Sequence, residues 1–221
     1  MGVGDSVRGL TVRRLGLVPY AQALALQERL VAERRSGRVG DMLLLLEHPH
    51  VITMGSSSDP EHVLVSPEER DRRGIDLVEV GRGGDVTYHG PGQLVGYPIL
   101  DLKPGRKDLH RYLRDLEEVI IRAAGSLGVA AHRSPGLTGV WTATGKLAAI
   151  GVRVSSGWIT SHGFALNVRN DLSWFGTIVP CGIHDRDVTS LSRELGREVT
   201  VDEASETVLG AFGDVFERAV L

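Results

Sequence analysis

Lys146-Leu-Ala-Ala-Ile-Gly-Val-Arg-Val-Ser-Ser-Gly-Trp-Ile-Thr-Ser-His-Gly-Phe-Ala-Leu-Asn-Val168 is the stretch that decides the fold. Two β-rich segments, 146–154 and 158–168, are joined by the short Ser-Ser-Gly link at 155–157, which is typical of a β-hairpin. The two strands of a hairpin pair antiparallel. The stretch therefore predicts a sheet with antiparallel pairing in the middle of the chain.

The rest of the chain supplies further strands and helices around this hairpin. The clearest helix is 108–127, whose apolar residues recur with the i, i+3, i+4, i+7 spacing of one buried stripe. A capping box, Thr200-Val-Asp-Glu203, begins the last helix. Other helices are expected at 21–35, 67–73 and 188–195, and other strands at 11–15, 41–47, 51–54, 77–80, 85–89, 94–100 and 139–142.

The order of these elements indicates the fold class. Helices and strands do not alternate regularly, which argues against a parallel, doubly wound sheet. We predict an α+β fold, in which a mixed or antiparallel sheet is flanked by helices that lie on one side. The length of 221 residues suggests one domain over residues 1–221.

Composition excludes several classes of function. The net charge of −3 argues against nucleic acid as a partner, since nucleic-acid binding usually needs a strongly basic face. No apolar run approaches the ~20 residues of a membrane helix. The N-terminus lacks the basic and apolar segments of a secretory signal. We therefore expect a cytoplasmic protein that does not bind membranes.

Two single residues stand out. The chain has 25 basic residues but only three lysines, Lys103, Lys107 and Lys146. Lys146 lies in a Gly-rich, apolar setting, and lysine can lose its proton where arginine cannot. The only cysteine, Cys181, lies between Pro180 and Gly182. This loop setting favours a reactive thiol over a buried apolar one.

A thiolate forms at neutral pH only beside a cation or a dipole. The spacing of the residues does not choose among the candidates Lys146, His89, His162 and His184.

A second unusual segment is 81–93, with glycines on both sides of a short strand. Backbone amides at such glycines can approach a ligand closely or form an anion-binding nest, although a hairpin without a ligand has the same pattern. No Gly-Lys-Ser/Thr follows, so the segment is not a P-loop. His48-x-His50 and Cys181-x-x-His184 are each short of the three or four ligands of a zinc site. We therefore predict neither a metal nor a cofactor.

These segments carry a resemblance to a known family. Segments 46–55, 82–94, 145–151, 162–167 and 178–182 resemble, in order and spacing, the motifs of the lipoyl(octanoyl) transferases, and the likeness covers roughly residues 10–215. The resemblance implies the fold shared with lipoate–protein ligases and the catalytic domain of biotin–protein ligases. It also implies transfer of an octanoyl group from octanoyl–acyl carrier protein to a lysine of a lipoyl domain.

The resemblance further implies site residues and partners. Cys181 would carry the acyl group as a thioester, with Lys146 as its partner. The acceptors would be the lipoyl domains of 2-oxoacid dehydrogenases and the H protein of glycine cleavage, in the first step of endogenous lipoylation. The implied substrate-binding residues are Arg82, Gly83, Gly84, Asp85, Val86, Thr87, Tyr88, His89, Ala149, Ile150, Gly151, Gly163, Phe164 and Ala165.

Three alternatives remain open at this point. An ATP-dependent lipoate–protein ligase on the same fold would need no catalytic thiol. An octanoyl amidotransferase would use the same chemistry with a different donor. A non-catalytic domain that binds lipoyl or carrier proteins would show no thiol reactivity.

Overall fold

The computed structural model describes residues 8–103, 105–179 and 187–221, and it contains two sheets. The main sheet has seven strands in the order β10-β1-β2-β6-β9-β8-β7, and the small sheet has the order β4-β3-β5. The main strands are β1 (Arg8–Leu17), β2 (Asp41–Glu47), β6 (Gln93–Ile99), β7 (Val140–Trp141), β8 (Lys146–Val154), β9 (Thr160–Asn167) and β10 (Arg218–Val220). The small sheet consists of β3 (Val51–Met54), β4 (Asp76–Glu79) and β5 (Val86–His89).

Strand pairing confirms a mixed sheet. β8 and β9 form the predicted antiparallel hairpin, from the Ala148–Leu166 pair to the Val154–Thr160 pair. β6 is antiparallel to both β9 and β2. Parallel pairs occur at the edges, where β1 pairs with β2 and β10, and β3 pairs with β4. The sequence did not predict β10, which is a three-residue strand whose pairing partner is more than 200 residues away.

The helices are α1 (Tyr20–Arg35), α2 (Pro67–Arg73), α3 (Leu109–Ser126), α4 (Leu191–Leu195) and α5 (Val201–Phe216), with short 3₁₀ helices at Pro60–His62 and Leu172–Thr177. The predicted cap of α5 is confirmed, because the Thr200 side chain accepts a hydrogen bond from the Glu203 amide. The structure describes no helix long and apolar enough to cross a membrane.

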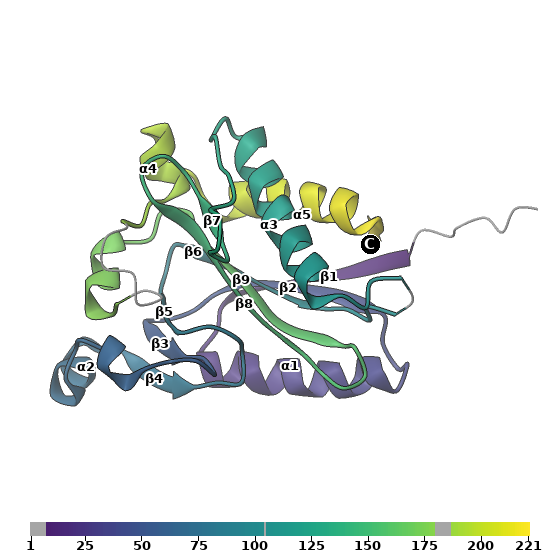
Figure 1. The fold of residues 1–221 in the computed structure, drawn as a ribbon, viewed down its shortest axis with the longest axis horizontal. Helices are drawn as coiled ribbons and strands as arrows, with labels where there is room; N and C mark the ends of the chain where they lie inside the picture. Colours follow the sequence, from purple (N-terminus) through teal and green to yellow (C-terminus); the bar gives the residue numbers. More distant parts are fainter. Residues whose placement is uncertain (1–7, 104, 180–186) are drawn as a thin grey trace, which may run out of the picture.

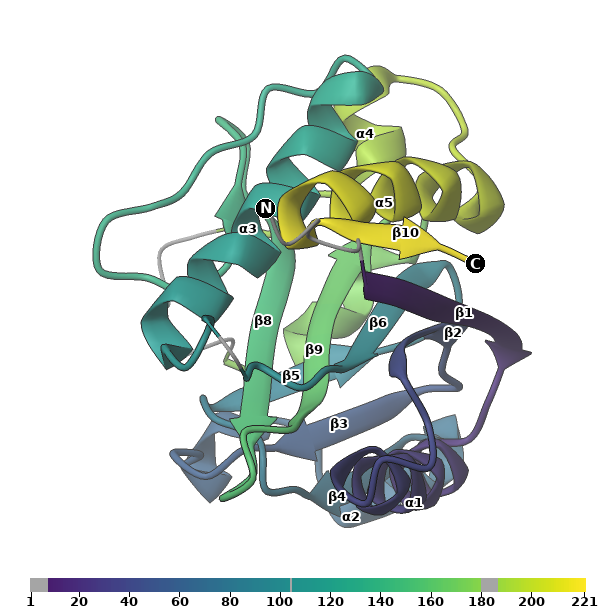
Figure 2. The ribbon, with the colours of Figure 1, turned by 90° about the vertical axis from the view of Figure 1, so that its right-hand side faces the viewer.

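The expectation that all helices lie on one side of the sheet is wrong. Figure 1 and Figure 2 show α3 and α5 on one face of the main sheet and α1 on the other. The reason lies in β2, where Leu43 and Leu45 join the core beneath α3 and α5, while Leu44 and Leu46 join the core beneath α1. An uninterrupted apolar run is typical of a strand buried on both faces.

The buried faces of two helices include polar residues that the apolar pattern missed. α1 buries Gln27 together with Tyr20, Ala23 and Leu30. α3 follows the predicted stripe but also buries Glu117, whose carboxylate accepts hydrogen bonds from Arg114, Arg133 and the Gly139 amide. A buried charge of this kind requires such partners.

We predict that Leu44→Ala lowers the free energy of unfolding by roughly 2–5 kcal/mol, because it leaves a cavity in a fully buried site. The matched control is Leu109→Ala, since Leu109 is 42% exposed at the start of α3. Urea unfolding of both variants checks the prediction. A loss below about 1 kcal/mol for Leu44→Ala would contradict the two-faced core.

Candidate active site

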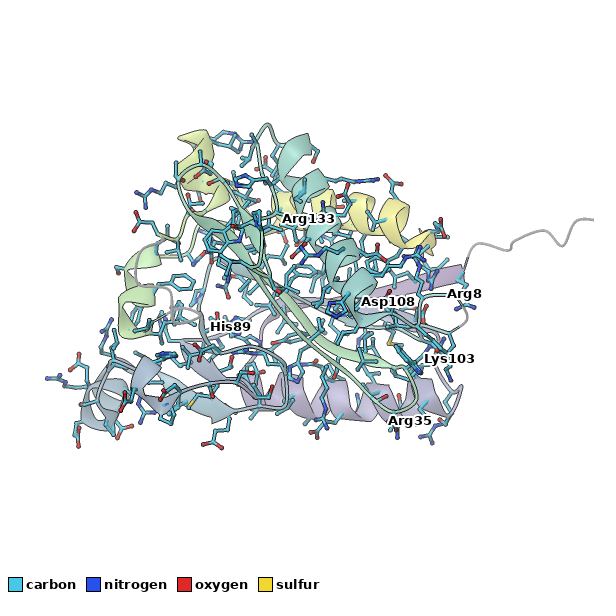
Figure 3. All side chains as sticks on the ribbon, viewed as in Figure 1. Arg8, Arg35, His89, Lys103, Asp108 and Arg133 are labelled. Atoms are coloured by element: carbon cyan, nitrogen blue, oxygen red, sulfur yellow. The ribbon has the colours of Figure 1, made fainter. Side chains whose placement is uncertain are left out.

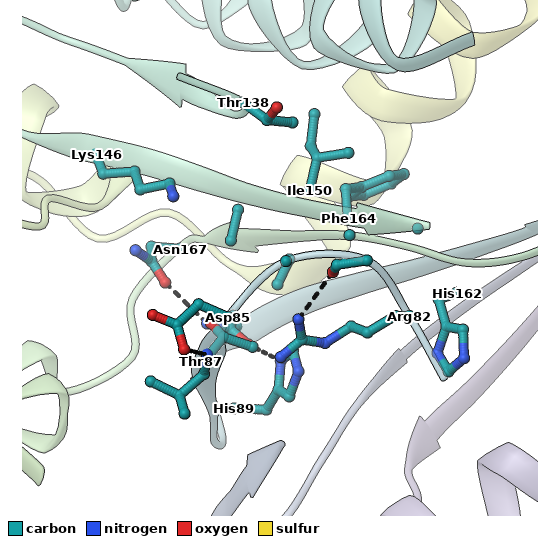
Figure 4. Close-up of a pocket in the computed structure, with 18 of the residues that line it drawn as sticks. Arg82, Asp85, Thr87, His89, Thr138, Lys146, Ile150, His162, Phe164 and Asn167 are labelled. Carbon is teal, nitrogen blue, oxygen red and sulfur yellow. Dashed lines mark hydrogen bonds between the residues drawn. The ribbon is translucent and has the colours of Figure 1, made fainter. Parts of the chain in front are cut away.

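A cavity of about 180 Å³ lies between the β8–β9 hairpin and the loop that leads into β5. Figure 4 shows side chains from both elements around it. Every substrate-binding residue implied by the resemblance lines this cavity except Tyr88. The other lining residues are Tyr20, Gln93, Tyr97, Gly136, Leu137, Thr138, Trp141, Lys146, His162, Asn167, Phe175 and Val188.

The cavity walls depend on backbone-to-backbone contact. A Cβ at Gly163 would lie 2.1 Å from the Gly96 carbonyl oxygen, and one at Gly151 would lie 2.9 Å from the Gly83 carbonyl oxygen. Only glycine permits such close approach. The glycines therefore let neighbouring chain segments close around a space that larger residues would fill.

The glycine-rich loop is held against β8, and Arg82 fixes it. The Gly83 amide donates to the Val152 carbonyl at 3.0 Å. The Arg82 guanidinium, which is 7% exposed, donates to the Thr53 carbonyl at 2.8 Å and to the Thr53 hydroxyl. The Gly83 amide is therefore already paired, and much of the glycine pattern serves to dock the loop.

Tyr88 lies outside the cavity. Its hydroxyl is 2.6 Å from His50 Nδ1, and its ring stacks parallel to Trp174 in the core of the small sheet. His50 in turn stacks on Trp174 at 4.0 Å between ring centroids. Tyr88 therefore supports the strand that presents its neighbours and does not contact the cavity.

Lys146 begins β8 and lies at the cavity wall with 8% exposure. Its Nζ lies 5.3 Å from the centroid of the Trp141 ring, within range of a cation–π interaction. Its amide donates to the Asp187 carbonyl at 2.9 Å, and its carbonyl accepts from the Thr189 amide at 3.0 Å. A Cβ at Gly145 would lie 2.6 Å from the Asp187 oxygen, so glycine is needed for this pairing.

Glu194 holds the two segments on either side of this pairing. Its Oε1 accepts hydrogen bonds from the hydroxyls of Thr142 and Thr144, in the turn before Lys146, and from Thr189 at 2.5 Å. Burial raises the pKa of Glu194, but the hydrogen bonds from these three hydroxyls and the charge of Arg193 together lower the pKa overall. A carboxylate that stays ionised keeps all three hydroxyls as donors, and so fixes Lys146 between them.

Cys181 and His184 lie outside the described residues, but the chain on both sides is held. The Val179 amide donates to the His62 carbonyl at 2.8 Å, and Asp187 pairs with Lys146 as described above. Phe175 and Val188, on the two sides of the same segment, both line the cavity.

A buried polar chain fixes the tautomer of His89. Gln93 Nε2 donates to the Tyr88 carbonyl and to Asn167 Oδ1, so Gln93 Oε1 must accept from His89 Nδ1 at 2.8 Å. Asn167 Nδ2 donates onward to the Thr189 carbonyl. Burial is the main effect that lowers the pKa of His89 to about 3, and the Arg82 guanidinium acts in the same direction. His89 therefore presents an unprotonated Nε2 and does not supply a proton to an oxyanion.

His48 and His162 are also neutral. Burial lowers the pKa of each to about 4. His48 Nδ1 donates to the Val18 carbonyl, so its Nε2 accepts from the Tyr97 hydroxyl at 2.7 Å. Both ring nitrogens of His48 are thus engaged, which removes it as a metal ligand. Within the described residues no group of three or more His, Cys, Asp or Glu is arranged to hold a metal ion.

Sequence reasoning missed several cavity residues. Gln93 and Asn167 lie inside the quoted motifs, and their positions next to His89 and Phe164 were an available signal. Tyr20 and Trp141 come from separate elements, and only the fold brings them to the cavity.

Figure 3 shows His89 in the interior of the molecule, whereas Arg35 and Lys103 lie at its rim.

Comparison with known proteins gives consistent results. Residues 19–213 match the family model of the lipoyl protein ligase A/B catalytic domain. The chain is 55% identical to an octanoyltransferase of Rubrobacter xylanophilus, over 93% of each chain. It is 50% identical to an octanoyltransferase of Chloroflexus aurantiacus, over 95% of each chain.

Solved structures share the fold at low identity. One is the structure of protein Ta0514 from T. acidophilum with bound lipoic acid, which is described as a putative lipoate protein ligase. Its TM-score is 0.74 at 16% identity. The match covers 97% of this chain and 87% of that one. The biotin protein ligase of Aquifex aeolicus with biotin and ATP has a TM-score of 0.56 at 16% identity, covering 94% and 70%.

The neutral histidines predict a dependence of stability on pH. The folded-state pKa values of His48, His89 and His162 lie below the ordinary 6.5, so the unfolded chain binds more protons between about pH 4 and 6.5. The free energy of unfolding must therefore fall as pH drops through this window. His162→Asn removes one such group and should weaken the slope by up to about 1.4 kcal/mol per pH unit.

Urea unfolding at several pH values between 4 and 7 measures this slope. The control is His110→Asn, because His110 is an exposed residue on α3 and its replacement should leave the slope unchanged. Equal slopes for the wild type and His162→Asn would refute a neutral buried His162.

Proposed function

The chain belongs to the family of lipoyl protein ligase A/B catalytic domains and is an octanoyltransferase, and we propose that it carries the octanoyl group as a thioester on Cys181. One observation supports this most. Lys146 lies buried at the cavity wall, and its backbone pairs with Asp187 and Thr189, directly after the segment that carries Cys181.

The cavity suits an acyl chain. Ala149, Ile150, Phe164 and Ala165 line it, and Gly151 contributes only backbone. Small and apolar walls exclude water and favour burial of methylene groups, at about 0.8 kcal/mol each. The proposal assigns the carbonyl end of the chain to the Lys146 end of the cavity.

In the first step, the Cys181 thiolate attacks the carbonyl carbon of octanoyl–acyl carrier protein. A new C–S bond forms and the old one breaks. The carrier thiolate leaves and takes up the proton of the Lys146 ammonium, which becomes a neutral amine. The Lys146 ammonium stabilises the attacking thiolate electrostatically, because a cation beside a cysteine lowers its pKa.

In the second step, a lysine amine of the acceptor attacks the thioester on Cys181. The amide bond forms, the Cys181 thiolate leaves, and the amine loses a proton, which neutral Lys146 accepts. Since an amide is more stable than a thioester, the overall transfer runs downhill and consumes no ATP.

The partners follow from this chemistry. We propose acyl carrier protein as the donor, and as acceptors the lipoyl domains of 2-oxoacid dehydrogenases and the H protein of glycine cleavage. One structural neighbour is described as a bipartite lipoate protein ligase of an archaeal lipoylation system, together with its E2 lipoyl domain. We also propose that the protein acts in the cytoplasm.

The alternative is an ATP-dependent ligase, because solved ligases share this fold. Such an enzyme would activate a free acid as an adenylate. The identity of about 50% to octanoyltransferases favours direct transfer, whereas the similarity of about 16% to the ligases supports only the fold.

We predict that the wild-type protein, incubated with octanoyl–acyl carrier protein and no ATP, gains the mass of one octanoyl group. Cys181→Ser should gain none under the same conditions, because a serine hydroxyl is a much weaker nucleophile than a thiolate. Intact-protein mass spectrometry measures both. An adduct on another residue, or an adduct that requires ATP and free octanoate, would overturn the thioester assignment.

We predict that Lys146→Arg lowers the rate of transfer to the acceptor lysine by at least about 100-fold, because arginine keeps the positive charge but does not accept a proton. Single-turnover kinetics of each half-reaction separates the two roles. Lys103→Arg is the matched control, because Lys103 is exposed and lies outside the cavity. Full activity of Lys146→Arg would remove the base role.

A further inference from the structure

His162 has an unusual backbone conformation inside a strand. Its φ of +54° lies in the left-handed region, although it belongs to β9 and pairs with Val152. Few residues other than glycine adopt this region, and those that do often serve a functional site.

This conformation changes the face to which His162 belongs. Side chains alternate along a strand, so His162 should point with Phe164 and Leu166 toward α3 and α5. Instead, its ring meets the Tyr97 ring edge-on at 6.4 Å, on the face covered by α1. The positive φ therefore turns the ring from the packed core toward the cavity.

In this position the imidazole ring of His162 makes few hydrogen bonds. Its amide donates to Gln27 Oε1 at 2.8 Å, but this bond needs no imidazole. Its Nδ1 is buried and has no hydrogen-bond partner among the described residues. The ring is thus kept at this position as a neutral, bulky group and not as one end of a polar network.

His162 also lies in the walls of two cavities. A second cavity of about 250 Å³, here called the α1 cavity, is lined by Leu24, Gln27, Glu28, Val31, Ala32, Arg35, Arg153, Ser155, Ser161 and His162. Of these residues, only His162 also lines the central cavity. His162 is therefore the residue at which the walls of the two cavities meet.

The position of His162 relative to Lys146 completes the argument. Lys146 begins β8, and Val152, the partner of His162, lies six residues further along the same strand. Figure 4 shows Lys146 and His162 at opposite ends of the labelled residues. An acyl chain whose carbonyl lies at Lys146 therefore extends along β8 toward His162.

We propose that His162 is the specificity-determining residue that closes the far end of the acyl cavity and limits the length of the fatty acyl chain. Without its ring, the central cavity joins the α1 cavity, and longer chains enter along Leu24, Val31 and Ala32. This inference rests on the proposed octanoyl transfer, and it adds a structural basis for selection of the chain length.

The test compares dodecanoyl– and octanoyl–acyl carrier protein as donors for the wild type and His162→Gly. Glycine suits the left-handed backbone, so the variant removes the ring without strain. Each methylene that becomes buried adds roughly fourfold to binding. We expect the dodecanoyl-to-octanoyl ratio of kcat/KM to rise at least about tenfold. His162→Asn, which also tolerates this backbone and is smaller than histidine, should raise the ratio in the same direction.

Two further variants isolate the effect of the ring. Glu217→Gly relieves a residue with the same φ of +54° at the end of α5, far from the cavity, and should leave the ratio unchanged. Adding Ala32→Phe to His162→Gly fills the α1 cavity and should restore the preference for octanoyl.

The outcomes decide whether the His162 ring limits the length of the acyl chain. An unchanged ratio in both His162 variants overturns the proposal, as does a rise in Glu217→Gly or a rise that persists with Ala32→Phe. These results are distinct from failure of the proposed function, which would appear as a wild-type protein that transfers no octanoyl group at all.

Discussion

The site depends on the close contact of backbone with backbone at a few glycines. Gly163 allows the Gly96 carbonyl to approach β9, and Gly151 allows the Gly83 carbonyl to approach β8. A single methyl group at either position would push the glycine-rich loop or β6 away. Where these glycines form the walls, the position of the walls is set by the backbone and does not vary with side-chain rotamers. An acyl cavity of defined width follows from this constraint.

The same sheet carries the polar groups that organise the chemistry. The chain from His89 through Gln93 and Asn167 to Thr189 crosses β6 and β9, and ends next to the backbone of Lys146. The hydrogen bonds run without a break from His89 Nδ1 to the Thr189 carbonyl, and connected buried hydrogen bonds of this kind strengthen one another. The cavity and the end of the cysteine-bearing segment therefore keep a fixed relation, although they are far apart in the sequence.

Much of this could be predicted from the sequence, where local pattern decides the outcome. The β8–β9 hairpin, the stripe of α3 and the cap at Thr200 all follow from spacing over fewer than about 25 residues. The features that the sequence did not predict depend on contacts between distant segments. Gln27 interrupts the apolar face of α1 in the sequence, yet its side chain is buried. It accepts the hydrogen bond that the buried amide of His162 requires. α1 covers the second face of the main sheet because β2 presents apolar side chains on both faces.

The free-energy cost of placing a histidine at position 162 indicates a functional role for this residue. A non-glycine residue in the left-handed region costs on the order of 1–3 kcal/mol. Its buried, unpaired Nδ1 costs about 1–3 kcal/mol more. Glycine would avoid both costs with the same backbone, and asparagine would reduce the first. Stability alone therefore disfavours a histidine here, and among the described residues its buried Nδ1 finds no hydrogen-bond partner that would compensate. The compensation must be in function, and a bulky neutral wall at the end of the acyl cavity supplies it.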